Sequence, residues 1–371
     1  MAIEDSTDLA SQPEQLSEHR TNQLLDAVSS EAFDTWYQER TFRQNIQNGK
    51  PYFNGPSKTK PAKDHTPSKL LQCHRKIFYN ALNAPAESER PSGIFWIGSQ
   101  FEEDIALPFL REAVVSSDEY VTNSLWIEIT ETTDAGEIRI RGETDPVIVD
   151  AEGNPLILTE IKTKQSVDNL TAPDDHHRAQ AHAYMKGLST EYNRPITDTV
   201  FLYGSRETLD IKVFHCEFDR SFWQETVVPW LADQTSYRLY GDLPPASPEY
   251  SWECNVCDYR ERCGKGEKEL SSVGPVGLLP LYTDYPREQI VEYLESHPNA
   301  KLTPAAASEY PDLAETYGAF NWRCLTCGQE FDWDAVDWNS QLTTPPTCPA
   351  CKNQETDSPS WLRGPDPANQ H

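Results

Sequence analysis

Along residues 66–268, stretches with the apolar spacing of a helix alternate with stretches that have the apolar spacing of a strand. This pattern predicts a segment that mixes helices and strands. Apolar residues at helical spacing predict helices over 68–82, 94–115, 174–188 and 220–239. Ser68 is the expected N-cap of the first helix, and Pro108 is expected to kink the second. Apolar or alternating runs predict strands over 125–130, 137–142, 145–150, 155–163, 199–204 and 208–218. This order predicts an α/β fold with a mixed central sheet flanked by helices.

The rest of the chain has other patterns. Residues 1–65 are polar and are expected to hold one helix, about 19–47, and a linker rich in Pro, Lys and Gly. Residues 269–318 are expected to be a helical linker with short helices beginning at Pro286 and Pro304. Residues 319–355 are rich in aromatic residues and cysteine, and residues 356–371 are expected to be a flexible tail. We therefore expect a central domain, 66–268, and a small C-terminal module.

Charge changes the picture of the surface. The 371 residues include 32 Lys and Arg but 59 Asp and Glu, and the formal net charge is −27. This excess of acid argues against two classes of protein: basic proteins that coat nucleic acid, and proteins that bind acidic membranes. The acid is spread along the chain, which predicts a surface adapted to a high-salt cytoplasm, with an ordinary acidic cytosolic protein as the alternative.

Nine cysteines require an explanation in such a chain. The sequence contains no run of 18 apolar residues, so no membrane span is expected. The first ten residues do not resemble a secretory signal. We therefore expect a cytoplasmic protein, in which thiols stay reduced and cysteines bind metals rather than form disulfides.

Candidate catalytic residues lie in the predicted strands. Glu160 and Lys162 are two positions apart, so both side chains leave the same face of their strand. If the turn at 151–155 pairs this strand with the preceding one, Asp145 can reach that face as well. Two carboxylates suit Mg²⁺ or Mn²⁺, and the ammonium group can orient water or stabilise negative charge, which together favour phosphodiester hydrolysis.

A simpler reading is an exposed charge pair on a strand, since Glu-x-Lys alone is common. The preceding Gly142-Glu-Thr-Asp145-Pro segment is much rarer. Gln180 and Tyr184 are four residues apart on one face of the predicted helix, where they can contact a substrate.

These motifs resemble those of the RecB-like branch of the PD-(D/E)XK nuclease superfamily over about residues 66–265. The resemblance implies a restriction-endonuclease-like core and metal-dependent DNA cleavage. It implies that Asp145 and Glu160 are metal ligands, that Lys162 is the catalytic lysine, and that Gln180 and Tyr184 form the motif that follows. Family members often carry a histidine four residues after a glycine in the preceding helix. Here Glu102 takes that place, with Glu103 as the neighbouring candidate.

Cys254, Cys257 and Cys263 follow the last predicted helix in a C-x2-C-x5-C pattern. A fourth ligand is needed, and the candidates are Cys73 and Cys216, of which Cys216 is expected to be buried on a strand. The spacing alone fits zinc or an iron–sulfur cluster. One early cysteine plus this pattern resembles the iron–sulfur nucleases of the RecB family, including AddB-type helicase–nucleases and CRISPR-associated exonucleases. That resemblance implies a [4Fe–4S] cluster held by Cys73, Cys254, Cys257 and Cys263.

A second group, Cys324, Cys327, Cys348 and Cys351, forms two C-x2-C pairs, which is a strong zinc pattern. We expect a zinc ribbon whose folding depends on the metal, since so short a segment lacks a core of its own. Residues 321–355 contain five acids but only Arg323 and Lys352 as bases. A protein partner is therefore a better expectation for the ribbon than DNA.

The sequence thus predicts a Mg²⁺- or Mn²⁺-dependent DNA nuclease, more specifically an exonuclease, that acts on single strands or ends. DNA repair, recombination and CRISPR adaptation are the expected settings. The alternatives are a non-catalytic DNA-binding or scaffold protein with a nuclease-like fold, and a redox module. A phosphate-binding G-x-x-x-x-G-K-[ST] motif is absent from the sequence, so no ATPase motor is expected within it.

Overall fold

A computed structural model of the chain describes residues 23–24, 27–47, 59–88, 92–266, 272–336, 338, 344–351 and 360–370. The chain divides into two compact units, residues 1–55 and 56–371. The first unit contains helix α2 (Ser30–Gln47). Of the expected helix over 19–47, residues 23, 24 and 27 are helical as well, but a bend at Val28 and Ser29 separates them from α2; residues 19–22, 25 and 26 lie outside the described residues. Within the described residues, no helix is long and apolar enough to cross a membrane.

A five-stranded mixed sheet forms the centre of the second unit. Its strands lie in the order β2-β5-β6-β7-β8, and β6 and β7 are parallel whereas the other neighbours are antiparallel. The bounds are Glu119–Thr122 for β2, Val147–Asp150 for β5, Pro155–Lys164 for β6, Asp198–Ser205 for β7 and Ile211–Glu217 for β8. The expected hairpin between β5 and β6 is confirmed, whereas β2 was not predicted because its four residues contain one aliphatic side chain, Val121, and show no alternation of apolar and polar positions.

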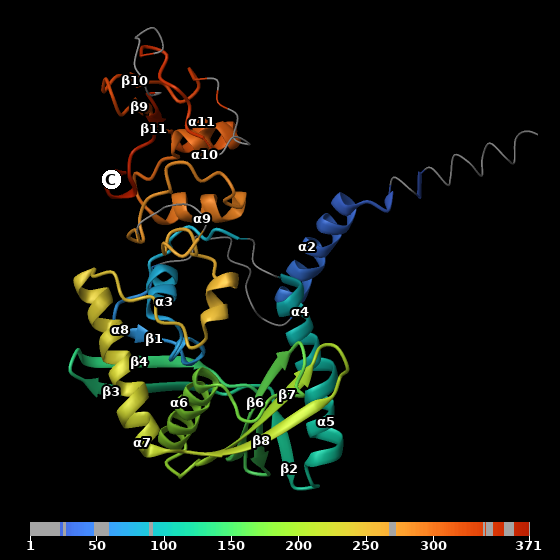
Figure 1. Cartoon of the computed structure of the whole chain (residues 1–371). Helices are drawn as coiled ribbons and strands as arrows, with labels where there is room; N and C mark the ends of the chain where they lie inside the picture. Colours follow the sequence, from blue (N-terminus) through green and yellow to red (C-terminus); the bar gives the residue numbers. More distant parts are fainter. Residues whose placement is uncertain are drawn as a thin grey trace, which may run out of the picture. The chain divides into compact units, whose positions relative to one another are not determined.

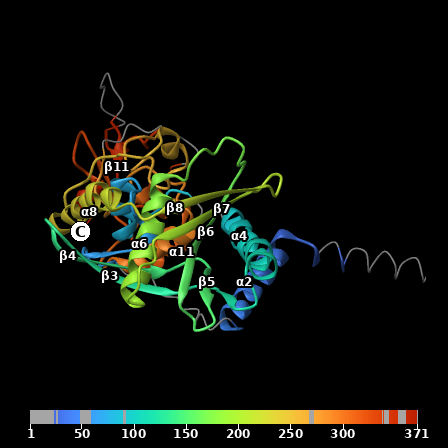
Figure 2. The same cartoon turned by 90° about the horizontal axis from the view of Figure 1, so that it is seen from below.

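A second sheet of three strands contains β1 (Asp64–His65), β4 (Gly136–Glu143) and β3 (Trp126–Thr133), in that order. Helix α6 (Asp175–Glu191) packs against both sheets. In both Figure 1 and Figure 2, β3 and β4 lie on the α8 side of α6, and β6 and β7 lie on its other side. The bounds of α8 are Val228–Tyr240; it continues from α7 (Arg220–Phe222) through a π-helical turn, Trp223–Val227.

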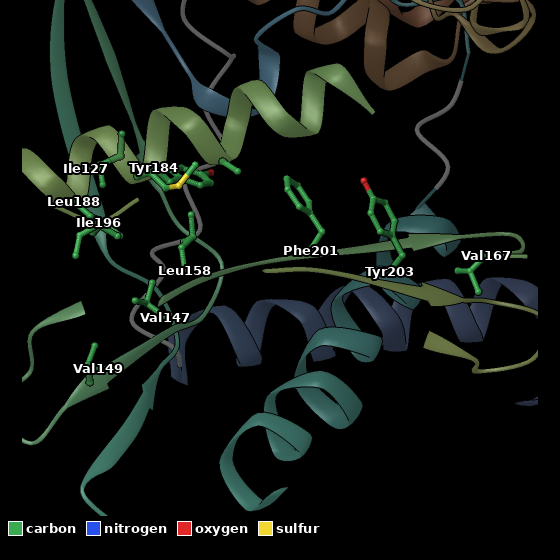
Figure 3. Packing of buried hydrophobic residues seen from close by; sticks show 12 residues of the cluster. Ile127, Val147, Val149, Leu158, Val167, Tyr184, Leu188, Ile196, Phe201 and Tyr203 are labelled. Carbon is green, nitrogen blue, oxygen red and sulfur yellow. The ribbon is translucent and has the colours of Figure 1, made fainter. Parts of the chain in front are cut away.

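One hydrophobic core lies between α6 and the five-stranded sheet. Tyr184 and Leu188 of α6 point toward Leu158, Phe201 and Tyr203 of the sheet (Figure 3). Because side chains alternate along a strand, the neighbour Leu202 faces the opposite side of the sheet.

The opposite face is covered by one continuous helical segment, Ser92–Val114. It consists of α4 (Ser92–Gln100), a π-helical stretch (Phe101–Ala106), α5 (Leu107–Phe109) and a second π-helical stretch (Leu110–Val114). The two π-helical stretches lie on either side of Pro108, whose missing N–H removes one ordinary helical bond. Phe101 packs with Ile161 and Leu202, so the helical segment lies on β6 and β7. The mixed α/β fold with helices on both faces of the sheet is thereby confirmed.

The first predicted helix of this domain begins later than expected. Helix α3 spans His74–Ala81, with Cys73 rather than Ser68 as its N-cap residue. Pro67–Lys69 form a single 3-10 turn, and Leu71 has a positive φ of 57°, which breaks the chain direction before α3. The prediction from 68 was wrong because apolar spacing does not reveal this backbone reversal.

The described residues between 272 and 370 form packed structure of their own. Helices α9 (Arg287–Ser296), α10 (Pro304–Glu309) and α11 (Pro311–Tyr317) enclose a core around Tyr285, Ile290 and Tyr293. A small antiparallel sheet follows, in which β9 (Trp322–Cys324) pairs with β10 (Glu330–Phe331) and β11 (Leu362–Arg363). Strand β11 and the buried Gln370 lie within the range expected to be a flexible tail; two-residue strands carry no pattern that predicts them.

Gly187→Ala is expected to destabilise the second unit by about 1–3 kcal/mol, because the added methyl group overpacks the contact of α6 with β3. A Cβ at Gly187 would lie 2.6 Å from Cβ of Ile127. Gly93→Ala in helix α4 is the matched control, since no atom lies within 4 Å of its added Cβ. Thermal unfolding of both variants measures the effect; equal melting temperatures would contradict this packing.

Candidate active site and cysteine sites

Asp145 lies in the turn that connects β4 to β5, just before the strand that was expected to begin there. Its Oδ2 accepts a hydrogen bond of 2.7 Å from the backbone N–H of Ile161 on β6. The next residue, Pro146, accepts bonds of 2.5 Å from Oγ1 and 3.2 Å from the N–H of Thr159. The turn is therefore held on β6, with the Asp145 carboxylate between the positions of Glu160 and Lys162.

Glu160 and Lys162 share one face of β6, as the alternation predicts. The ammonium of Lys162 forms an ion pair with Glu160 and lies 3.5 Å from Oδ2 of Asp145. The structure thus brings the three predicted residues together at one spot.

The electrostatics of this spot are set by burial. The side chain of Glu160 is 0% exposed, and burial, with Asp145 as a second cause, raises its pKa to about 8. Burial alone would lower the pKa of Lys162, but the carboxylates of Glu160 and Asp145 outweigh it and raise this pKa. Lys162 therefore keeps its proton at neutral pH and acts as a donor and a positive charge.

The donor set fits a hard divalent cation. Oε1 of Glu160 is paired with the Lys162 ammonium, whereas no residue that the structure describes bonds its buried Oε2, which leaves that oxygen open toward a metal. Glu102 also acts on the pKa of Glu160, and it is half-buried whereas Glu103 is exposed, so Glu102 is the better placed of the two. The ligand atoms of Glu102, Asp145 and Glu160 are not among the described groups whose atoms all lie within 4.8 Å of one another.

Gln180 and Tyr184 approach the same site from α6. Nε2 of Gln180 donates a bond of 3.2 Å to the hydroxyl of Tyr184, and both side chains are buried. Burial raises the pKa of Tyr184, and Glu160 and Asp145 raise it further, which places this phenol within electrostatic reach of the carboxylates. Tyr184 also belongs to the core below α6 (Figure 3), so it has a packing role in addition.

A polar group that the predicted site does not include lies beside these residues. Lys164 continues the Glu160–Lys162 face of β6 and pairs with Asp174 at 2.5 Å. Nδ1 of His177 lies 2.8 Å from the hydroxyl of Tyr203, and burial lowers the pKa of His177, so its ring is neutral. The period-2 pattern of β6 could have identified Lys164, but the contacts of α6 with β7 are not visible in the sequence.

Four cysteines from two distant parts of the chain line one cavity. Cys73 precedes α3, whereas Cys254 lies in a 3-10 turn at Ser251–Val256 and Cys257 and Cys263 follow that turn. The other candidate, Cys216, lies on β8 and does not line this cavity.

The charge of this cavity wall comes in part from Arg75, whose Nη1 donates to the carbonyl of Cys263 at 3.1 Å and lies 3.6 Å from its Sγ. Such a donor suits thiolate ligands, which carry negative charge.

Comparison with known families decides what these features belong to. The family model described as the PD-(D/E)XK nuclease superfamily matches residues 11–264, more than half of the chain and including Asp145, Glu160 and Lys162. The chain belongs to the PD-(D/E)XK nuclease superfamily. Proteins of this superfamily are generally nucleases that use divalent metal ions and bind nucleic acid. The match ends one residue after Cys263.

Other comparisons are more distant. No curated protein matches the chain. Among solved structures, the crystal structure of SSO0001 is similar with a TM-score of 0.40 and 15% identity, over 63% of this chain and 97% of that one. Rai1 of Scheffersomyces stipitis is similar with a TM-score of 0.24 and 13% identity, over 62% of this chain and 76% of that one.

In this PD-(D/E)XK protein the second cysteine group lies outside the superfamily match. The Sγ atoms of Cys324 and Cys351 are 3.8 Å apart, as are those of Cys327 and Cys348, and all four lie within 4.8 Å of one another. A tetrahedral zinc ion with Zn–S bonds of about 2.3 Å requires sulfur separations of about 3.8 Å. The four cysteines could therefore hold one zinc ion.

The first C-x2-C pair has the local geometry of a metal knuckle. Sγ of Cys324 accepts the backbone N–H groups of Thr326 and Cys327, each at 3.3 Å. Burial alone would raise the pKa of Cys324, but these donors lower it to about 6, which favours the thiolate. Gly328 has a φ of +73°, the tight turn expected after the knuckle.

Proposed function

We propose that this protein is a Mg²⁺- or Mn²⁺-dependent deoxyribonuclease with an exonuclease activity on single strands or ends. The observation that carries the proposal is the buried carboxylate of Glu160, whose Oε2 is open, beside Asp145 and the ammonium of Lys162, in a chain of the PD-(D/E)XK superfamily. DNA repair, recombination or CRISPR adaptation is the proposed setting, in a high-salt cytoplasm.

The proposed roles follow from charge and protonation. Asp145, Glu160 and Glu102 would hold the cation, which supplies Lewis-acid activation of phosphate and water when bound. Lys162 cannot serve as a base while it is protonated, so it positions water or stabilises the negative charge that develops on phosphate. Gln180 and Tyr184 orient the substrate from α6. A bound divalent ion brings local positive charge to the phosphate, which offsets the net charge of −27.

We further propose a [4Fe–4S] cluster at Cys73, Cys254, Cys257 and Cys263. The sulfur atoms of this set are not among the described groups that lie within 4.8 Å of one another, whereas those of the zinc set are. A cluster of eight atoms holds its ligands farther apart than a single zinc ion, which supports iron–sulfur at the first set. The second set is proposed to hold zinc in a ribbon that binds a protein partner.

Cleavage assays with metal control test the enzyme proposal. Labelled single-stranded and duplex DNA should be cut when Mg²⁺ or Mn²⁺ is present, and chelation should abolish the cleavage. Product sizes distinguish exonuclease from endonuclease action. DNA binding without cleavage under any divalent metal would contradict the enzyme and favour a scaffold protein.

Metal analysis tests the cofactors separately. Anaerobically purified protein should be brown and contain about four irons, matching sulfide, and one zinc per chain. A colourless protein with about two zinc ions would contradict the iron–sulfur cluster.

A further inference from the structure

A groove of about 560 Å³ begins on the strand that carries Glu160 and Lys162, although neither of these two residues lines it. Its wall begins on β6 at Thr163 and Lys164, directly after Lys162, and Lys164 shares the strand face of Glu160 and Lys162. It continues to the loop that carries the first two cysteines of the C-x2-C-x5-C set. Lys76 and Glu253 line both this groove and the cysteine cavity, so the groove borders the cysteine cavity at its other end.

The far wall of the groove carries two exposed aromatic rings. Tyr250 and Trp252 are stacked, with ring centroids 6.1 Å apart and an angle of 16° between the planes. Tyr250 is 42% exposed and Trp252 is 59% exposed, and Val256 of the same loop is 71% exposed. Large apolar side chains gathered at a groove, rather than scattered singly, indicate a binding surface.

Cationic side chains line the same groove. Lys76, Lys164 and Arg206 contribute three positive charges to a chain whose net charge is −27. Lys164 is paired with Asp174, whereas the ion pairs found among the described residues include none for Lys76 or Arg206. These two charges therefore remain available for phosphate.

The two glutamates of the groove are engaged in holding the aromatic loop. Oε2 of Glu249 lies 3.0 Å from Nδ1 of His176, and its carboxylate also bonds the hydroxyl of Tyr250. Oε1 of Glu253 accepts the backbone N–H of Tyr250 at 3.0 Å. Both glutamates are thus bonded to groups of the loop or of His176, and these bonds fix the position of the stacked rings.

We propose that this groove binds an unpaired nucleic acid strand whose scissile phosphate lies at the carboxylate site, with a base stacked on Trp252. The inference rests on the proposed nuclease function and adds where the single strand binds and which ring stacks on its base. Aromatic faces bind any exposed base, and lysine and arginine beside them bind the phosphates, which is the combination used for single strands. Duplex DNA does not fit this combination, because its bases are already stacked and paired.

The test is the affinity for a fluorescein-labelled oligothymidylate, measured by anisotropy at one fixed salt concentration without added Mg²⁺ or Mn²⁺. Trp252→Ala should weaken binding by about 5- to 150-fold, since stacking contributes about 1–3 kcal/mol per base. Trp252→Phe keeps an aromatic face and should retain most of the affinity. Trp126→Ala is the matched control, since Trp126 is 58% exposed but lies on β3 outside the groove.

An oligonucleotide of the same length with abasic sites separates stacking from phosphate contacts. The parent protein should bind it more weakly than oligothymidylate, and Trp252→Ala should remove this difference. An equal loss on both oligonucleotides would overturn base stacking, and so would unchanged binding by Trp252→Ala. The visible spectrum and zinc content of each variant verify that the cysteine loop is intact.

The result is independent of cleavage. If the protein cuts DNA but Trp252→Ala binds and cuts like the parent, the groove assignment fails and the proposed function stands. If the parent protein binds oligothymidylate through Trp252 but cuts no DNA with any divalent metal, the groove stands and the nuclease proposal fails.

Discussion

Lys162→Met is expected to lower single-turnover DNA cleavage by about 10²- to 10³-fold, the usual cost of removing one charged group that stabilises a transition state. Methionine keeps the length of the side chain but removes the ammonium that contacts both Glu160 and Asp145. The measurement is the rate of product formation at saturating Mn²⁺. Lys212→Met on β8 is the control, because β7 separates this strand from β6 and Lys212 bonds the carbonyl of Asp168 and not the carboxylate site.

A companion variant separates the role of the metal ligands from that of the lysine. Asp145→Asn can still accept the N–H of Ile161, so the turn stays in place, but it loses the charge that would hold a cation. Cleavage should therefore fall at low Mn²⁺ and recover in part at high Mn²⁺, whereas Lys162→Met should not recover. The visible absorbance of the cysteine site should be unchanged in both. Full activity of either purified variant would contradict the site.

The part of this site that lies within one hairpin, Asp145, Glu160 and Lys162, could be predicted from the sequence. Strand alternation places Glu160 and Lys162 on one face, and the Gly-Asn turn after β5 brings Asp145 toward them. Both relations involve residues within about one hairpin. The structure adds that Glu160 is completely buried and that Lys162 stays protonated, which depends on what the helices cover.

The remainder depends on contacts between distant segments. Parallel pairing of β6 with β7 passes through helix α6, and it brings Tyr203 beside His177 and Lys162. The cavity of the first cysteine set joins Cys73 to Cys254 across most of the domain. Neither relation follows from periodicity, although motif resemblance named the same cysteines. The start of helix α3 was predicted wrongly for a local reason. The positive φ of Leu71 reverses the chain before α3, and the spacing of apolar residues does not reveal it.

Cys351→Ser is expected to unfold the C-terminal metal module, because zinc binding supplies about 10–16 kcal/mol in small structural sites. The strands of this module are only two or three residues long, and its core consists mainly of the metal cysteines with Trp322 and Leu362. The variant should lose about one zinc per chain. Hydrogen exchange should become fast at the backbone N–H of Cys324, which is bonded to the carbonyl of Gln329. Cys216→Ser, outside both cysteine sets, should change neither zinc content nor exchange.

The same variant also tests what the zinc module does. The superfamily match ends at residue 264, so cleavage of naked DNA should survive the loss of zinc if the module binds a protein. The module carries more acid than base, and Arg323 and Arg363, which lie on its strands, contribute few charges toward phosphate. A large loss of DNA affinity in Cys351→Ser would therefore assign the module to DNA, and unchanged zinc content and exchange would contradict the tetrahedral site itself.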